Sequence, residues 1–148
     1  MNDSLGTDDC ANRIRPSSAD SSRAQMCSRI LIIEDETLVA QSLAELVTEA
    51  GFLALPPVSA AAEAAKMLER CRPHAVILDF VLRDGIATGV AIELASRGIP
   101  FIVYSGLPPV GVSLPELARV RWHEKPGSGE ELIASLAELI GEDDVLRG

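Results

Sequence analysis

Three short apolar runs constrain the fold of this chain most strongly. They cover residues 30–33, 75–78 and 101–104. None of them alternates between polar and apolar residues, as a strand with one face in water would. Continuous apolar runs of four residues are typical of strands that helices cover on both faces. The runs therefore predict the central strands of a parallel sheet.

Segments with helical spacing separate these strands. Apolar residues recur at that spacing after residue 39, after residue 59 and around Val90 and Leu94. Ser59 is expected to cap the second helix, and Ser128 with Glu131 forms a capping-box pattern before the last helix, over residues 128–140. Glycine ends helices by adopting a left-handed conformation, and we expect this at three positions: Gly51, Gly98 and Gly141.

The fourth helix is expected to be short or irregular. Residues 106–115 hold three prolines and two glycines, which keep a long helix from starting before Pro115. Residues 52–55 and 121–123 supply two more short strands. Five strands alternating with helices predict an α/β fold, a doubly wound five-stranded parallel sheet with right-handed crossovers.

Composition excludes several classes of function. The 148 residues include 13 Lys and Arg against 22 Asp and Glu, a net charge of −9, which argues against contact with nucleic acid or anionic membranes. No apolar run approaches the roughly 18 residues of a membrane span, and the first residues lack a signal core. Three scattered cysteines without a CxxC or Cys/His cluster argue against a structural zinc site and favour a reduced, cytoplasmic setting.

The chain divides into one domain and two tails. Residues 1–28 are rich in Ser, Asp, Asn and Arg, with little apolar surface to offset the entropy of ordering, so we expect a flexible tail there. The domain is expected over residues 29–141, followed by a C-terminal tail over residues 142–148. An excised fragment of a larger protein remains an open alternative.

Polar residues follow the predicted strands at one edge of the sheet. They are Glu34 and Asp35, Asp79, Ser105 and Lys125. Carboxyl ends of parallel strands meet at one edge, where ligands bind in such sheets. Converging carboxylates need a cation, and hard oxygen ligands with open positions suit Mg²⁺. A hydroxyl and a lysine beside them complete a site for phosphoryl transfer.

Each of these residues also has an ordinary structural interpretation. Glu34 and Asp35 could favour the positive end of a helix dipole, and Asp79 could start a turn. Ser105 could cap a turn, and Lys125 could be a solvated surface lysine. The joint pattern on successive strand ends favours the site.

The residues at these strand ends resemble the receiver domain of bacterial two-component response regulators. The matching motifs are Ile-Leu-Ile-Ile-Glu-Asp-Glu at 30–36, Val-Ile-Leu-Asp at 76–79, Ile-Val-Tyr-Ser-Gly at 102–106 and Glu-Lys-Pro at 124–126. The resemblance covers about residues 29–140. It implies a flavodoxin-like receiver fold.

The resemblance also implies a role for each acid. Asp79 is expected to be the phosphoacceptor. Glu34 and Asp35 are the expected Mg²⁺-binding pair, with Asp79 and the backbone carbonyl of Val81 as further ligands.

Three residues on the last two strands are expected to respond to the phosphoryl group. Ser105 is the hydroxyl that follows it and Lys125 is the lysine that pairs with it, so both join Asp79 as catalytic residues. Ser105 and Trp122 form the expected switch. The Lys125–Pro126 bond is expected to be cis, as in the family, and X-Pro bonds adopt cis at modest cost.

The function predicted from this resemblance is that of a stand-alone phosphoacceptor in a two-component phosphorelay. The loop at 83–89 is similar to that of stand-alone receivers. The phosphoryl donor would be a sensor histidine kinase or a histidine phosphotransfer protein, and the signal would pass by contact with a downstream protein partner or a homodimer. The chain would catalyse only its own phosphorylation and dephosphorylation.

Two other classes remain as alternatives. One is a receiver-like interaction module that is never phosphorylated. The other is an enzyme, but a dehalogenase-type phosphatase needs a second acid where Val81 stands. A nucleotide or flavin binder needs a Gly-rich or hydroxyl-rich loop, and residues 34–36 are anionic instead.

Overall fold

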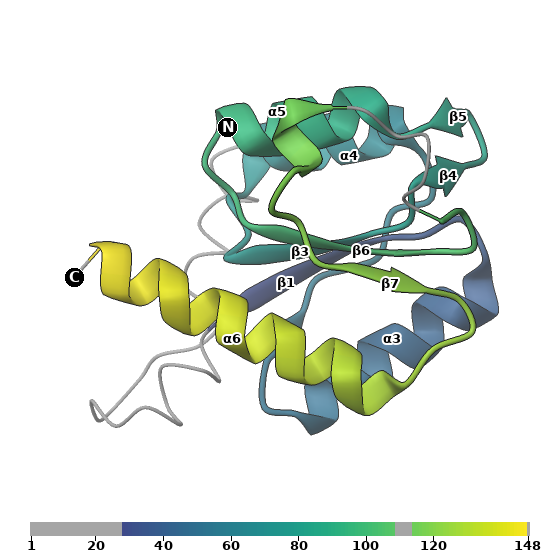
Figure 1. Ribbon diagram of the computed structural model, residues 1–148. Helices are drawn as coiled ribbons and strands as arrows, with labels where there is room; N and C mark the ends of the chain where they lie inside the picture. Colours follow the sequence, from purple (N-terminus) through teal and green to yellow (C-terminus); the bar gives the residue numbers. More distant parts are fainter. Residues whose placement is uncertain (1–27, 109–113, 148) are drawn as a thin grey trace.

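A central parallel sheet organises the computed structural model of the protein, which describes residues 28–108 and 114–147. Its strand order is β2-β1-β3-β6-β7 and all neighbours are parallel. The strands are β2 (Leu53–Ala54), β1 (Arg29–Ile33), β3 (Ala75–Leu78), β6 (Phe101–Ser105) and β7 (Trp122–Glu124). The predicted α/β, doubly wound, five-stranded sheet is confirmed (Figure 1).

Helices cover both faces of this sheet. Helices α3 (Thr37–Glu49) and α6 (Gly129–Arg147) lie on one face, and α4 (Ala61–Arg70) and α5 (Thr88–Ser96) lie on the other (Figure 1). Successive strand residues point to opposite faces, so Ile30 and Ile32 pack with the first pair of helices while Leu31 and Ile33 pack with the second. The unbroken apolar runs arise because each strand contributes to two cores.

Glycine ends two of the helices as expected. Gly51 and Gly98 have φ angles of 99° and 69°, in the left-handed region that favours glycine. The amide of Phe52 reaches back to the carbonyl of Val47, as in a Schellman motif. The expectation for Gly141 is wrong, because α6 continues to Arg147 and the φ angle of Gly141 is not positive.

A short 3₁₀ turn lies where the sequence predicts a short or irregular fourth helix. It covers Pro115–Leu117, between β6 and β7, and packs near α5. The expectation of a short or irregular helix is therefore confirmed for the described part of this connection, which excludes residues 109–113. Its partly buried side chains Leu114, Leu117 and Val120 pack against the core on the α4–α5 side.

A small hairpin follows β3, and it was not predicted from the sequence. Strands β4 (Val81–Leu82) and β5 (Gly85–Ile86) pair antiparallel around a two-residue turn, Arg83–Asp84. Gly85 has a φ angle of 127°, which an L-residue rarely adopts. The strands are only two residues long, too short for an alternating pattern to show.

The turn of this hairpin caps helix α4 from a distance. Asp84 accepts hydrogen bonds from the amides of Ala61 and Ala62, at 3.0 and 3.4 Å. The expectation that Ser59 caps this helix is wrong, because the N-cap position is Ala60. Ser59 instead donates to Glu63 and accepts from Arg83. The last helix does start as predicted, since Ser128 accepts from the amide of Glu131 at 3.2 Å.

The cysteines and the two tails differ from what the sequence predicts or lie outside the described residues. Cys71, expected to be a reduced thiol, is disulfide-bonded, and Cys10 and Cys27 lie outside the described residues. The predicted flexible tail over residues 1–28 also lies outside them, apart from Ser28. The C-terminal tail expected from residue 142 is helical to Arg147.

Within residues 28–108 and 114–147, no helix combines the length and the apolar character needed to cross a membrane.

Two glycine substitutions test how these helices end. Gly98→Ala should lower the free energy of unfolding by about 1 kcal/mol, because alanine is strained in the left-handed region. Gly141→Ala should raise it by up to about 1 kcal/mol, because Gly141 is helical and a Cβ there meets nothing within 4 Å. Urea denaturation measures both changes. Destabilisation by Gly141→Ala would contradict a continuous α6.

Candidate functional site

Four strands deliver the predicted site residues to one edge of the sheet. Glu34 follows β1, Asp79 follows β3, Ser105 ends β6 and Lys125 follows β7. Backbone hydrogen bonds between neighbouring strands fix the register of these residues. The amide of Asp79 donates to the carbonyl of Ile33 and the amide of Lys125 donates to the carbonyl of Ser105, both at 2.9 Å. The sequence thus places these residues together through the register of the parallel sheet.

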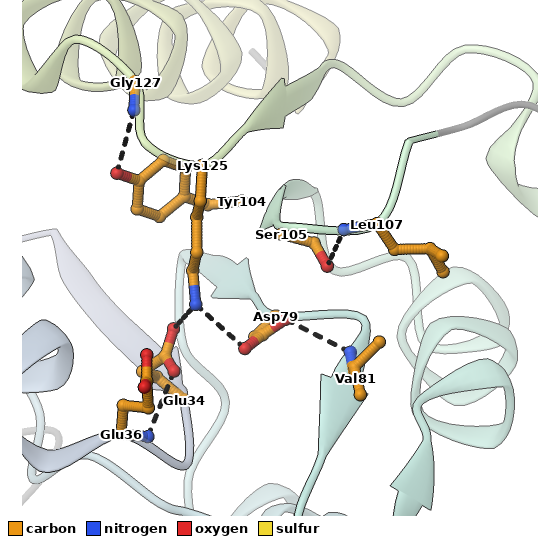
Figure 2. A network of polar contacts seen from close by, with 9 residues as sticks. All are labelled: Glu34, Glu36, Asp79, Val81, Tyr104, Ser105, Leu107, Lys125 and Gly127. Atoms are coloured by element: carbon orange, nitrogen blue, oxygen red, sulfur yellow. Dashed lines mark hydrogen bonds and ion pairs between the residues drawn. The ribbon is translucent and has the colours of Figure 1, made fainter.

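Lys125 joins two buried carboxylates. Its Nζ lies 2.7 Å from Oε1 of Glu34 and 3.0 Å from Oδ2 of Asp79 (Figure 2). The side chains of Glu34 and Asp79 are 1% and 6% exposed, and that of Lys125 is 18% exposed. Buried charges of one sign need such a partner, since their hydration is lost. Lys125 is therefore part of a buried ionic cluster, and the interpretation as a solvated surface lysine is wrong.

Burial brings the pKa of Glu34 close to neutral pH in this cluster. Burial is the largest effect and raises the pKa of Glu34 to about 7, opposed by the hydrogen bonds from Lys125 and from the amide of Glu36. For Lys125, burial lowers the pKa, but the bonds to Glu34 and Asp79 outweigh it and leave the pKa raised. A cation near Glu34 would favour the charged form of this carboxylate.

Three carboxylates are placed to share a metal ion. One oxygen each from Glu34, Asp35 and Asp79 lies within 4.8 Å of the others. Asp35 is half-buried while the other two are buried, so the group opens to solvent on the Asp35 side. An all-oxygen set with room for water fits Mg²⁺ by ligand type. The residues present therefore fit the metal that the sequence predicts.

Val81 lies beside the predicted acceptor. Its amide donates to Oδ1 of Asp79 at 3.1 Å, so both carboxylate oxygens of Asp79 have a partner (Figure 2). This bond orients the carboxylate at the start of the β4–β5 hairpin. A metal bond to the Val81 carbonyl stays a prediction.

Ser105 and Trp122 are linked through the backbone of Leu107. The Ser105 hydroxyl is fully buried and accepts from the amide of Leu107 at 3.2 Å. The indole of Trp122 donates to the carbonyl of Leu107 at 2.8 Å, and its ring lies 5.4 Å from that of Phe80, next to Asp79. The expected switch residues thus share one neighbour, and Figure 2 shows the bond between the Ser105 hydroxyl and the Leu107 amide.

Tyr104 belongs to this site and was not predicted. The Nζ of Lys125 lies 5.7 Å from the centre of its ring, and its hydroxyl accepts from the amide of Gly127 at 3.3 Å. Its position directly before Ser105, on the strand next to Lys125, was the available signal. The Lys125–Pro126 bond is cis, as expected.

No protein-family model matches the chain. The transcriptional regulatory protein PdtaR of Mycobacterium tuberculosis is 39% identical over 77 residues, which are 51% of this chain and 37% of that protein. The chain therefore spans well under half the length of the curated relative that it matches.

Solved structures match over more of the chain. SdrG from Sphingomonas melonis Fr1 is 32% identical with a TM-score of 0.65, covering 76% of this chain and 96% of that one. The signal receiver domain of a Luxo-type repressor protein from Vibrio parahaemolyticus is 25% identical with a TM-score of 0.70, covering 82% and 98%.

One structure similar in fold contains a metal. The receiver domain of the sensor histidine kinase PA1611 from Pseudomonas aeruginosa PAO1, solved with a magnesium ion coordinated in its active site cleft, is 21% identical with a TM-score of 0.66 and covers 77% of this chain and 98% of its own. The shared sheet order, the acids and lysine at its carboxyl edge and these matches lead to one assignment. The chain belongs to the family of response regulator receiver domains.

Proposed function

We propose that this protein is a phosphoacceptor receiver of a two-component system that is phosphorylated on Asp79. The observation that carries the proposal is the contact of one ammonium, on Lys125, with both Glu34 and Asp79 in a buried acidic cluster. A purely structural cluster has little reason to gather three carboxylates and to join only two of them to a lysine. A phosphoryl site needs this arrangement, since it must attract an anion to an acid.

The reaction forms one bond and breaks one. An oxygen of Asp79 attacks the phosphorus of a phosphohistidine, an oxygen–phosphorus bond forms and the phosphorus–nitrogen bond breaks. The electron pair leaves with the imidazole of the donor. Lys125, bonded to Asp79, would neutralise the charge on the phosphoryl oxygens, and Val81 would orient Asp79 through its amide.

Magnesium is the cofactor we propose for this step. When bound, it would neutralise charge on the phosphoryl oxygens in the transition state. Glu34, Asp35 and Asp79 would hold it, with the Val81 carbonyl as a further ligand. Support comes from the ligand type of these residues and from the magnesium in the fold-related receiver of PA1611.

The donor and the output are also part of the proposal. A sensor histidine kinase or a histidine phosphotransfer protein would supply the phosphoryl group, and a downstream protein would receive the signal by contact. The chain would act on itself only, without turnover of a separate substrate.

Substitution of Asp79 tests the acceptor. Asp79→Asn should abolish phosphorylation by acetyl phosphate with Mg²⁺, because an amide is a poor nucleophile, while folding is retained. Glu36→Gln is the matched control, since that exposed side chain lies next to the cluster and only its amide bonds Glu34. A phosphate-affinity gel separates the two forms. Phosphorylation of Asp79→Asn at the wild-type level would show that Asp79 is not the acceptor, whereas a wild-type protein that accepts no phosphate would favour the interaction-module alternative.

Magnesium affinity should depend on pH around 7. In the metal-free protein the pKa of Glu34 is about 7, so below that pH the metal must displace a proton. The affinity should therefore rise from pH 6 to pH 8, by at most about tenfold per pH unit. Calorimetric titration measures it. Glu34→Gln should bind more weakly and lose this dependence, and an unchanged slope in that variant would remove Glu34 from the site.

Trp122 should report phosphorylation, being the only tryptophan in the chain. Its indole and the Ser105 hydroxyl share Leu107, so movement of Ser105 toward a phosphoryl group should change the surroundings of the ring. Fluorescence should change on adding Mg²⁺ with beryllofluoride, a phosphoryl mimic, and not in Asp79→Asn. An undiminished response in Ser105→Ala would leave Trp122 a structural residue.

A further inference from the structure

Tyr104 lies against the lysine of the site from the strand next to it. Its ring is half-buried alongside the Lys125 side chain, with 5.7 Å between the ring centre and Nζ (Figure 2). An ammonium within about 6 Å of an aromatic ring centre is attracted by the ring electrons. The ammonium of Lys125 already donates to Glu34 and Asp79, and the ring lies on another side of it.

The same side chain anchors the loop that carries Lys125. The Tyr104 hydroxyl accepts from the amide of Gly127, two residues after the lysine, at 3.3 Å. A Cβ on Gly127 would lie 2.8 Å from the carbonyl oxygen of Glu124 and 3.5 Å from Cε1 of Tyr104. The loop therefore turns tightly back on Glu124 and lies in van der Waals contact with the ring, and the bond from the Lys125 amide to Ser105 holds its other side.

A lysine needs such support more than the acids do. Its four-carbon stem has several rotatable bonds, whereas Glu34 and Asp79 are fixed by burial and by amide donors. When a phosphoryl group arrives, the ammonium must turn from carboxylate oxygens toward phosphoryl oxygens. The ring attraction involves neither carboxylate, so it would persist through that exchange.

We propose that Tyr104 is a positioning residue that holds the Lys125 ammonium for the phosphoryl group, by its ring face and by the bond of its hydroxyl to Gly127. This inference rests on the proposed phosphoacceptor function. The ring also forms one wall of a cavity of about 270 Å³ with Leu38, Leu46 and Gly127. The competing explanation is that Tyr104 only fills space there.

A double-mutant cycle separates the two explanations. The measured quantity is the affinity for beryllofluoride in the presence of saturating Mg²⁺, by calorimetry. Tyr104→Leu should weaken it roughly tenfold, in line with a desolvated ammonium–ring contact. In a Lys125→Ala background the same change should have almost no effect, because Tyr104 acts through the lysine. Equal losses in both backgrounds would overturn the proposal.

Two variants serve as controls. Tyr104→Phe keeps the ring and should retain most of the affinity that Tyr104→Leu loses. Leu46→Ala opens the same cavity from α3, has no bond to Lys125 and should leave beryllofluoride affinity within about twofold of wild type. A tenfold loss in Leu46→Ala would show that the cavity, not the ring, supports the site, and would overturn the proposal.

A measurement on the unaltered protein does not depend on whether the variants fold. Lys66 and Lys125 are the only lysines in the chain, so only two sets of ε-methylene NMR signals have to be assigned. The signal of Lys125 should lie upfield of that of Lys66, because protons near the face of an aromatic ring are shielded, and should stay so with Mg²⁺ and beryllofluoride. Coincident signals in both states would overturn the proposal.

These readouts also distinguish its failure from that of the proposed function. If wild type is phosphorylated on Asp79 and the cycle is additive, only the role of Tyr104 is wrong. If wild type neither binds beryllofluoride nor accepts phosphate, the phosphoacceptor function is wrong and the positioning role is overturned with it.

Discussion

The ammonium of Lys125, held between Glu34 and Asp79, is the contact on which the rest of this site depends. Two carboxylates that are almost without solvent would repel each other strongly, and removing the partner of a buried charge typically costs about 3–5 kcal/mol. Even with this lysine, burial keeps the pKa of Glu34 near 7. The buried cluster can therefore take up a proton near neutral pH, and the magnesium proposed above would compete with that proton.

The sheet makes that contact possible, and the sheet was predictable from sequence. Buried strands in a two-sided core must be apolar along their whole length, so residues 30–33 and 75–78 could be identified without any other information. The carboxyl ends of parallel strands share an edge, which then placed Glu34, Asp79 and Lys125 together. These predictions succeeded because they rest on burial and on chain direction, which one sequence reveals directly.

The features that were missed depend on contacts between distant segments. Asp84 caps a helix more than twenty residues away, so the local rule that favoured Ser59 failed. Gly141 was expected to end α6, but a glycine ends a helix only where the backbone turns left-handed, and this one does not. Tyr104 is an aromatic residue of the kind that fills the core of a sheet. Only its contacts with Gly127 and Lys125, which come from a distant segment, show that it belongs to the site.

The hairpin that follows Asp79 has a consequence for how this domain assembles. The first amides of α4 have no partner within their own helix, and Asp84 in the turn between β4 and β5 supplies one. Opening of the hairpin would therefore also remove the cap of α4, which couples the start of this helix to the chain just after Asp79. Amide exchange at Ala61 and at Val81 should consequently respond together to conditions that open the hairpin.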